Sequence, residues 1–288
     1  NLKNKNKEFE DKLFYSYELV GVSDNIKNVK EQISKIAISE SRIFINGPTG
    51  SGKELIARKI HKESKRKRGP FTIINGALLN IEKYELELFG EEKNNGSIFY
   101  GALEKSTGGI LLIDEISEVP LDTQSKILRV LTDQKFKRIN GNHDINVDVR
   151  IICCSSKNIK NEIENGNFRE DLYHRLNVFE INLEPLKNRV ADIPLLVEYF
   201  SEKISTNYNL KKLSIDSNNS YLLNYDWPGN IRELRNLIER IAILSPDSPD
   251  KISNIIKESL KTPDIKNIQS ENSLSIPLKE ARENFEKE

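Results

Sequence analysis

The stretch Gly47-Pro48-Thr49-Gly50-Ser51-Gly52-Lys53 follows directly on the apolar run 43–45 and precedes a helical pattern over 54–63. A strand, a glycine-rich loop and a helix in this order are typical of a phosphate-binding P-loop. Glycine lets the backbone turn its N–H groups toward an anion, and Lys53 adds a positive charge for the β- and γ-phosphates. The stretch therefore predicts a site for a nucleoside triphosphate with Mg²⁺. The alternative, a flexible glycine loop before a lysine, is disfavoured by the strand before it and the helix after it.

Carboxylates complete this predicted site. Glu54 stands where a serine or threonine usually ligates Mg²⁺, so the metal contact has to run through water, another hydroxyl or a carboxylate. Asp114 and Glu115 end the apolar run 110–113, at the sheet edge where ligands lie in open parallel sheets. We expect Asp114 to orient Mg²⁺, directly or through water, and Glu115 to polarise the attacking water. The alternative is a strand end capped by two exposed acids.

Composition limits the class of protein. The chain has 288 residues with 44 basic and 44 acidic side chains, which argues against a nucleic-acid grip by bulk charge. No apolar run approaches about 18 residues, so we expect no membrane span and a cytoplasmic location. Cys153 and Cys154 are adjacent within an apolar run, where side chains alternate between faces. We interpret them as buried thiols in a reducing compartment, not as a disulfide or metal site.

The order of elements predicts an α/β fold. Short apolar runs alternate with helical patterns as far as about residue 184, which indicates a parallel sheet with helices on both faces. From 192 to about 261 apolar residues recur at helical spacing, which indicates a small helical subdomain. We therefore predict a three-layer α/β/α sheet of the P-loop type, followed by an all-helical lid. The predicted strands lie near 43–45, 71–75, 110–113, 147–154 and 178–183.

A P-loop sheet followed by a helical lid is typical of AAA+ ATPases. Four further segments accompany the P-loop, in order: Glu-Leu-Phe-Gly at 87–90, Ile-Asp-Glu-Ile at 113–116, Phe-Arg-Glu-Asp-Leu-Tyr-His-Arg-Leu at 168–176 and Trp-Pro-Gly-Asn-Ile-Arg-Glu-Leu at 227–234. With the P-loop and its glutamate, these motifs resemble the bacterial enhancer-binding proteins, which are σ54-dependent transcription activators. The resemblance runs from about 19 to 260 and is nearest to the NtrX-type response regulators.

The resemblance implies the central domain of a two-component transcription regulator. Its cofactors would be ATP and Mg²⁺, with Val20 and Gly21 on the adenine side. Its partners would be further copies of itself in a hexamer, a similar ring or a dimer, together with DNA, RNA polymerase and a sensor histidine kinase acting through a receiver domain. The implied organisation is a linker at 1–17, the nucleotide-binding subdomain at 18–188, the lid at 189–262, a linker at 263–275 and the start of a Fis-type DNA-binding domain at 276–288.

The resemblance also implies roles for three polar residues. Asn75 would hold Glu115 inactive, since an amide can hydrogen-bond a carboxylate without changing its charge. The alternative for Asn75 is a turn-favouring residue at a strand end. Arg169 and Arg175 would reach the γ-phosphate bound by a neighbouring subunit, because a guanidinium is always charged and forks onto phosphate oxygens. The alternative for the arginines is internal pairing with the acids at 170–171.

Arg232 has a physical argument of its own. Pro228-Gly229 predicts a turn, Asn230 an N-cap, and Glu233 the third helical position of a capping box. Arg232 then lies in the first turn, where the helix dipole disfavours a cation by roughly 0.3 kcal/mol or more. A cation there indicates an anionic partner, and the resemblance implies a sensor arginine that reads phosphate from the lid. Pairing with Glu233 or Asn236 is the alternative.

Two stretches depart from the σ54 activators. Those proteins follow the 87–90 motif with a Gly-Ala-Phe-Thr-Gly-Ala loop that contacts the σ factor, whereas the shorter stretch 91–104 lacks it. NtrX-type regulators share this loss, so σ54 remodelling is not expected. Ser155-Ser156 replace the usual Thr-Asn, and a serine has shorter reach and fewer donors, so we expect slow hydrolysis.

Two functions remain open at this point. One is an ATPase ring that does mechanical work on a transcription complex. The other is a nucleotide-gated oligomerisation module of a DNA-binding regulator, with little or no ATPase activity. The presence of Glu115, Arg169 and Arg175 favours ATP hydrolysis. The absence of the Gly-Ala-Phe-Thr-Gly-Ala loop favours gated oligomerisation over mechanical work on a transcription complex. We predict an ATP-binding, ATP-hydrolysing regulator of transcription.

Overall fold

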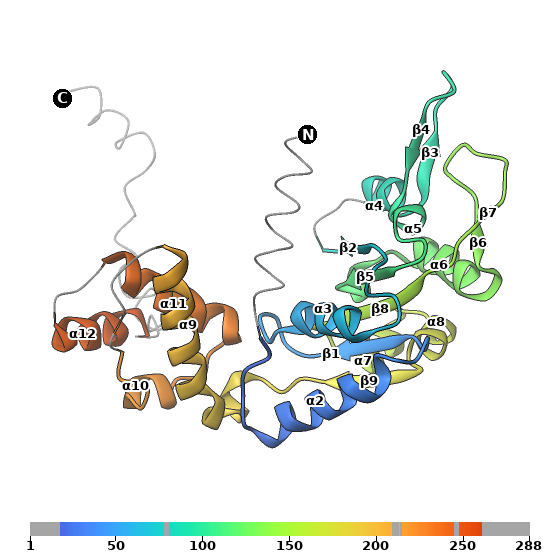
Figure 1. Cartoon of the computed structure of the whole chain (residues 1–288). Helices are drawn as coiled ribbons and strands as arrows, with labels where there is room; N and C mark the ends of the chain where they lie inside the picture. Colours follow the sequence, from blue (N-terminus) through green and yellow to red (C-terminus); the bar gives the residue numbers. More distant parts are fainter. Residues whose placement is uncertain (1–17, 78–80, 209–212, 214, 245–247, 261–288) are drawn as a thin grey trace, which may run out of the picture.

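The computed structural model describes residues 18–77, 81–208, 213, 215–244 and 248–260. Within this part of the chain, strands and helices alternate up to residue 182, and only helices follow. Figure 1 shows the helical part, coloured orange to red, at one end of the molecule and the α/β part at the other. No helix among the described residues is both long enough and apolar enough to cross a bilayer. The predicted linkers at 1–17 and 263–275 and the start of a DNA-binding domain at 276–288 lie outside the described residues.

A five-stranded parallel sheet forms the centre of the α/β part. Its strand order is β2-β5-β8-β1-β9, and every neighbouring pair is parallel. The three central strands are buried almost throughout, as expected where helices cover both faces. The strand bounds are β1 (Ile43–Asn46), β2 (Phe71–Asn75), β5 (Ile110–Asp114), β8 (Arg150–Ser155) and β9 (Phe179–Asn182).

Alternate side chains of these strands enter two separate cores. Phe44 and Cys153 pack with α4, α6 and α8 on one face, and Ile45 and Cys154 pack with α2 and α3 on the other. This arrangement confirms the predicted three-layer α/β/α fold. Burial raises the pKa of both thiols, which keeps them protonated and unreactive. The helix bounds are α2 (Asp24–Ile36), α3 (Lys53–Glu63), α4 (Ile81–Phe89), α5 (Ala102–Lys105), α6 (Leu121–Asp133), α7 (Ile159–Glu164) and α8 (Glu170–Leu176), with the 3₁₀ turn η1 (Ile116–Glu118).

The helical part has a third core of its own. Helices α9 and α11 pack against each other, and Trp227 is buried beside them with its indole N–H donating to the carbonyl of Leu222 at 2.9 Å. This confirms the all-helical lid. Its bounds are η2 (Leu186–Asn188), η3 (Val190–Asp192), α9 (Ile193–Asn207), α10 (Ser220–Leu223), α11 (Asn230–Leu244) and α12 (Pro249–Ser259).

The strand pattern differs from the prediction in two respects. The segment 147–149 precedes β8, because the N–H of Val147 donates to the carbonyl of Gln134 and the chain pairs with β5 only from Arg150 onward. Two short hairpins were also not predicted, since strands of two or three residues carry too little periodicity to be recognised. They are β3 (Gly90–Glu92) with β4 (Ile98–Tyr100), and β6 (Lys135–Phe136) with β7 (Ile145–Asn146). Figure 1 shows both projecting at the end of the molecule away from the lid.

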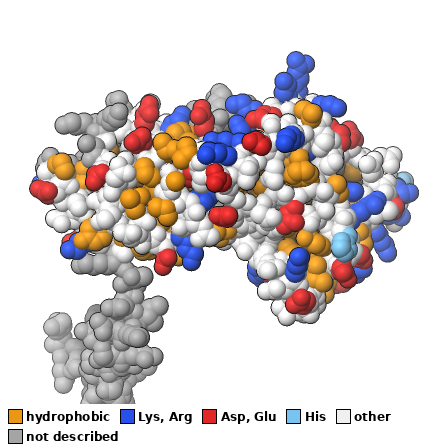
Figure 2. All heavy atoms as spheres, turned by 90° about the horizontal axis from the view of Figure 1, so that it is seen from below, with side chains coloured by type: hydrophobic (Ala, Val, Ile, Leu, Met, Phe, Trp, Pro, Cys, Tyr) orange, Lys and Arg blue, Asp and Glu red, His pale blue; other side chains and the backbone are white. Residues whose placement is uncertain are grey.

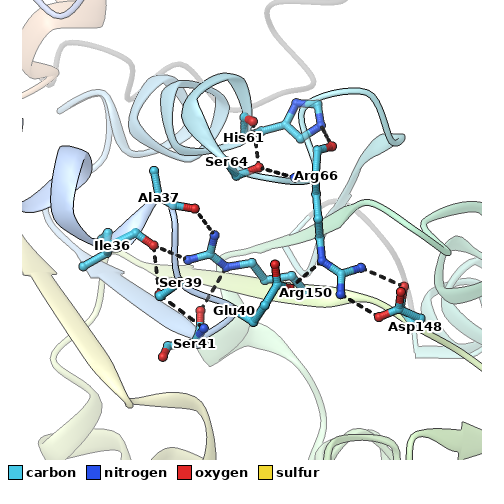
Figure 3. Close-up of polar contacts among 10 residues, drawn as sticks. All are labelled: Ile36, Ala37, Ser39, Glu40, Ser41, His61, Ser64, Arg66, Asp148 and Arg150. Atoms are coloured by element: carbon cyan, nitrogen blue, oxygen red, sulfur yellow. Dashed lines mark hydrogen bonds and ion pairs between the residues drawn. The ribbon is translucent and has the colours of Figure 1, made fainter.

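Buried arginines organise the amino-terminal edge of the sheet (Figure 3). Arg150 is 2% exposed and donates to the backbone carbonyls of Ile36, Ala37 and Ser41 at and just after the end of α2. Arg66 pairs with the carboxylates of Glu40 and Asp148, each at 2.6 Å. The basic loop at 62–68 therefore contributes at least one cation to structure rather than to a nucleic-acid surface. Figure 2 shows basic and acidic side chains interspersed on one face of the molecule, in agreement with the balanced charge.

Candidate nucleotide site

The P-loop connects β1 to α3 in a conformation that needs its glycines. Gly50 and Gly52 have φ angles of 77° and 105°, values that L side chains rarely adopt. Lys53 begins α3 and donates from Nζ to the carbonyl of Gly47 at 2.9 Å. The Ser51 hydroxyl is buried and has no hydrogen-bond partner among the described residues. An unsatisfied hydroxyl and a lysine at a helix N-terminus are suited to a phosphate chain, which would satisfy both.

Asp114 occupies the predicted place at the carboxyl end of β5. Its β2 register partner is Asn75, whose side-chain amide donates to Asp114 Oδ2 at 3.0 Å. The expectation that Asn75 holds Glu115 is therefore wrong for this structure. Asn75 and Asp114 are opposite each other on paired strands, while the chain turns away at Glu115, so the amide reaches the first acid of the pair and not the second. Asn75 Oδ1 accepts from the backbone N–H of Ala77, as in the turn-favouring alternative.

Glu115 is held from two directions. Its Oε2 accepts from both the backbone N–H and the hydroxyl of Ser156, at 2.9 and 2.7 Å. Its Oε1 lies 3.2 Å from Lys53 Nζ, and these two side chains are only 15% and 6% exposed. The Glu115 backbone has φ 50° and ψ 52°, which directs the side chain back over the sheet edge. Asp114 and Glu115 are thus half-buried rather than exposed.

The electrostatics of Asp114 fit a cation. Burial, then the neighbouring charge of Glu115, raises the pKa of Asp114; the charge of Lys53 opposes this rise and that of Glu54 adds to it. Within the residues that the structure describes, no three acids, histidines or cysteines gather closely enough to bind a metal by themselves. A Mg²⁺ held by Asp114 would therefore depend on phosphate oxygens and water for its other ligands. Glu54 itself pairs with Arg58 Nε at 2.8 Å, so it is not available as a ligand in this arrangement.

The lid touches the P-loop directly through Asn230. Its Nδ2 donates to the carbonyl of Thr49 at 2.9 Å, and its Oδ1 accepts from the buried backbone N–H of Leu186 at 2.8 Å. A methyl group on Gly50 would approach the carbonyl oxygen of Gly229 to 2.3 Å, so the contact needs glycine. Sequence reasoning missed this role, since Asn230 was expected to be an N-cap. Instead it has φ 53° and turns its side chain away from its own helix to join three segments.

Arg232 lies in the first turn of α11, as predicted. Its backbone N–H donates to the carbonyl of Gly50 at 3.3 Å, and its side chain is exposed in a groove of about 410 Å³ between Thr49 and the lid. Glu233 instead accepts from the N–H of Gly229 and from the hydroxyl of Tyr225. The Arg232 guanidinium makes no hydrogen bond or ion pair within the described part of the chain, so it is available to bind an anion.

The segment of Val20 and Gly21 is tied to the base of the lid. The buried carboxylate of Asp192 accepts from the N–H groups of Val22 and Ser23 at 2.6 and 2.7 Å, and from the Ser23 hydroxyl at 2.7 Å. Gly21 has φ 150°, and a Cβ there would lie 2.9 Å from that carboxylate. Val20 packs against the lid core. Asp192 therefore positions the predicted adenine side, a role that its place before an apolar helix did not reveal.

The two predicted finger arginines lie at opposite ends of α8. Arg169 precedes the helix and makes a bidentate pair with Asp171, at 2.9 and 2.6 Å, as the internal alternative proposed. Arg175 is exposed in the last turn. It lines a cavity of about 370 Å³ with Arg42 and Arg150, which precede β1 and begin β8 at the amino edge of the sheet. The chain's own P-loop is at the opposite edge, so Arg175 does not reach the phosphate site of its own subunit.

Comparison with known proteins identifies the family. The model of the Sigma-54 interaction domain matches residues 19–182, and that of the AAA+ ATPase lid domain matches residues 187–271. The chain belongs to the sigma-54 interaction domain family of AAA+ proteins. The resemblance to NtrX-type regulators is confirmed as well.

Several members of the sigma-54 interaction domain family match most of the chain. The nitrogen assimilation regulatory protein NtrX of Azorhizobium caulinodans is 42% identical over 280 residues, which are 94% of this chain and 61% of the relative. A putative NtrX-like response regulator of Rickettsia felis is 42% identical over 298 residues, covering 100% of this chain and 62% of the relative. The crystal structure of NtrX from Brucella abortus in complex with ATP is 40% identical, with a TM-score of 0.81, and the match covers 99% of this chain and 65% of that one. The chain thus spans about 61–62% of these curated relatives.

Substitution of Asn230 tests the contact between lid and P-loop in this family member. N230D keeps an acceptor for the Leu186 N–H but loses the donor to the Thr49 carbonyl. N230A loses both hydrogen bonds, and alanine adopts a positive φ less readily than asparagine. We expect N230D to accelerate hydrogen exchange of the Arg232 amide about tenfold or more, because it places a buried carboxylate against the carbonyl oxygens of Thr49 and Pro228. We expect N230A to lose roughly 2–4 kcal/mol in urea unfolding. N230G also loses both hydrogen bonds but relieves the strain of the positive φ, so its difference from N230A measures the backbone strain alone. An unchanged exchange rate of the Arg232 amide in N230D would contradict the proposed contact between lid and P-loop.

The raised pKa of Asp114 predicts a pH-dependent gain in stability for D114N. An acid whose pKa rises on folding binds more protons when folded, so its ionisation costs stability as pH climbs from the ordinary value of 3.8 through the raised one. Without Mg²⁺ or nucleotide, D114N should therefore be more stable than wild type at pH 7, and the difference should shrink toward zero below pH 3.8. Urea unfolding across this range measures it. D226N, at an exposed acid, serves as control. A D114N variant that is less stable than wild type at pH 7 would contradict the raised pKa of Asp114.

Proposed function

We propose that this chain binds ATP with Mg²⁺ at the P-loop and hydrolyses it, as the central domain of a two-component transcription regulator. The observation that carries the proposal is the convergence of Lys53, Asp114, Glu115 and the orphaned Ser51 hydroxyl at one edge of the sheet. NtrX from Brucella abortus has been crystallised with ADP and with ATP, at 40% identity to this chain in both cases. That likeness supports the same ligand here.

Each residue of the site has a defined part in this proposal. The P-loop amides and Lys53 hold the phosphates, and Asp114 holds the metal, which would polarise the phosphate oxygens. Glu115 is the group that accepts a proton from the attacking water. Arg232 contacts phosphate from the lid, and Val20 and Gly21 flank the adenine.

Self-association supplies the remaining cations. Arg175 lies at the amino edge of the sheet, away from its own P-loop, and is exposed in the last turn of α8. If the carboxyl ends of a second copy's strands face this surface, the nucleotide of that copy lies near Arg175. Arg169 can contact the same nucleotide once its ion pair with Asp171 is broken. The assembly is a ring such as a hexamer, or a dimer. The partners of the whole regulator are DNA, through a C-terminal domain, RNA polymerase, and a sensor histidine kinase that acts on a receiver domain.

The β3–β4 hairpin favours the second candidate function for the output, which is nucleotide-gated assembly without σ54 remodelling. Arg138 donates to Glu92 at 2.7 Å and to Glu104 at 2.6 and 2.9 Å, and its guanidinium lies 5.4 Å from the ring centre of Tyr100. The backbones of Glu92 and Ile139 are also hydrogen-bonded. Because these contacts fix the hairpin to the rest of the domain, it is better suited to a rigid surface than to a loop that moves with each ATP cycle.

Removal of the Lys53 ammonium tests ATP binding. We expect K53A to abolish detectable binding in calorimetry, since the variant lacks the charge that meets the β- and γ-phosphates. K59A is the matched control, because Lys59 lies on the same helix but pairs only with Glu63 at 3.2 Å. Equal affinity of K53A and wild type would refute the proposed site.

Turnover as a function of protein concentration tests hydrolysis and distinguishes the two outputs. If Arg175 acts across an interface, the rate per subunit should rise with concentration, and R175A should lower the plateau by about 100-fold or more while ATP affinity at low concentration stays unchanged. R129A, at an exposed arginine of α6, is the control. Tight ATP binding with no turnover at any concentration would support the gated assembly module instead.

A further inference from the structure

The order of strands places Ser156 between the two charges of the nucleotide site. Strand β8 lies between β5 and β1 in the sheet, so the residue that follows β8 lies between Glu115, which follows β5, and the P-loop, which follows β1. Ser156 is on the solvent side of this edge and directs both its backbone N–H and its hydroxyl at Glu115 Oε2. The same carboxylate pairs through Oε1 with Lys53 Nζ. One carboxylate is therefore bound at both oxygens.

Asn75 is not available for this task. Its amide donates to Asp114 and its carbonyl oxygen accepts from Ala77, so both ends of the side chain are engaged away from Glu115. The residue that hydrogen-bonds the Glu115 carboxylate in this chain is thus Ser156. A serine restrains a carboxylate with one hydroxyl hydrogen bond, and the adjacent backbone N–H adds a second.

We propose that Ser156 is a positioning residue that stores Glu115 against Lys53 while no nucleotide is bound, and that the triphosphate releases Glu115 by taking Lys53. This inference rests on the proposed ATP binding. A carboxylate that accepts two hydrogen bonds on one oxygen and an ion pair on the other is poorly placed to accept a proton from water. Phosphate oxygens compete with Glu115 for the single Lys53 ammonium, so ATP binding and release of Glu115 are coupled.

The coupling is measurable in ATP affinity, without any hydrolysis. S156A removes the hydroxyl but keeps the backbone donor, so Glu115 is held less firmly against Lys53 and competes less with ATP. We expect ATP to bind S156A about five-fold more tightly than wild type, which corresponds to about 1 kcal/mol, the net contribution of one ordinary hydrogen bond. In the E115Q background the competing charge is gone, and S156A should then change affinity by less than about 1.5-fold.

Two further variants separate positioning from a structural effect. S156T restores a hydroxyl and should return ATP affinity to the wild-type value. S34A, at an exposed helix serine that bonds only the carbonyl of Glu31, should change nothing. At saturating ATP and plateau protein concentration, S156A should turn over at least as fast as wild type, because the stored glutamate is freed.

The outcomes are distinct. Equal effects of S156A in the wild-type and E115Q backgrounds, or a fall in the turnover of S156A that S156T repairs, would overturn this inference alone and would make Ser156 a water-positioning group. Failure of the wild-type chain to bind ATP would overturn the proposed function, and this inference with it. Tighter binding confined to the background with Glu115 supports it.

Discussion

The ion pair between Lys53 and Glu115 is the interaction on which the site depends. It joins the residue that begins α3 to the residue that follows β5, across the intervening strand β8. Both side chains are largely shielded from water, so neither charge is tolerable alone at this place. Each of the two side chains therefore compensates the charge of the other.

The fold provides the geometry by ordinary means. Parallel pairing aligns the carboxyl ends of four strands, so that Asn75, Asp114, Ser156 and the P-loop share one edge of the sheet. The opposite edge is closed by Arg150 and Arg66, which satisfy backbone carbonyls and acids there. Arg175 lies at this second edge. Placing the phosphate site and an exposed arginine on opposite edges of one sheet suits a chain whose sites are completed by neighbouring copies.

The lid contacts the P-loop directly. Asn230 bonds the P-loop and the segment that leaves β9, and Asp192 fixes the segment that precedes α2. Two side chains at the base of the lid thus hydrogen-bond the segment after Gly21 and the P-loop. The first residues of α11 thus donate directly to the P-loop carbonyls of Thr49 and Gly50.

Local patterns in the sequence determined the α/β class, the P-loop, the two acids after β5, the buried thiols and the helical lid. Each of these follows from the periodicity of single elements, from motif spacing or from the order of elements along the chain. The partners of polar side chains were decided only by the tertiary structure. Whether Asn75 reaches Asp114 or Glu115 depends on strand register and on the left-handed turn at Glu115, and neither is visible along the chain.

The same reason explains Asn230 and Ser156. A good N-cap residue before a helix is used instead to join segments more than 40 residues away, because the lid packs where its side chain can reach them. Ser156 gains its contact with Glu115 only because β8 is inserted between β5 and β1. Hydrogen bonds between distant segments depend on strand order and packing, which are properties of the whole fold, so sequence patterns determine the elements and tertiary structure determines their polar connections.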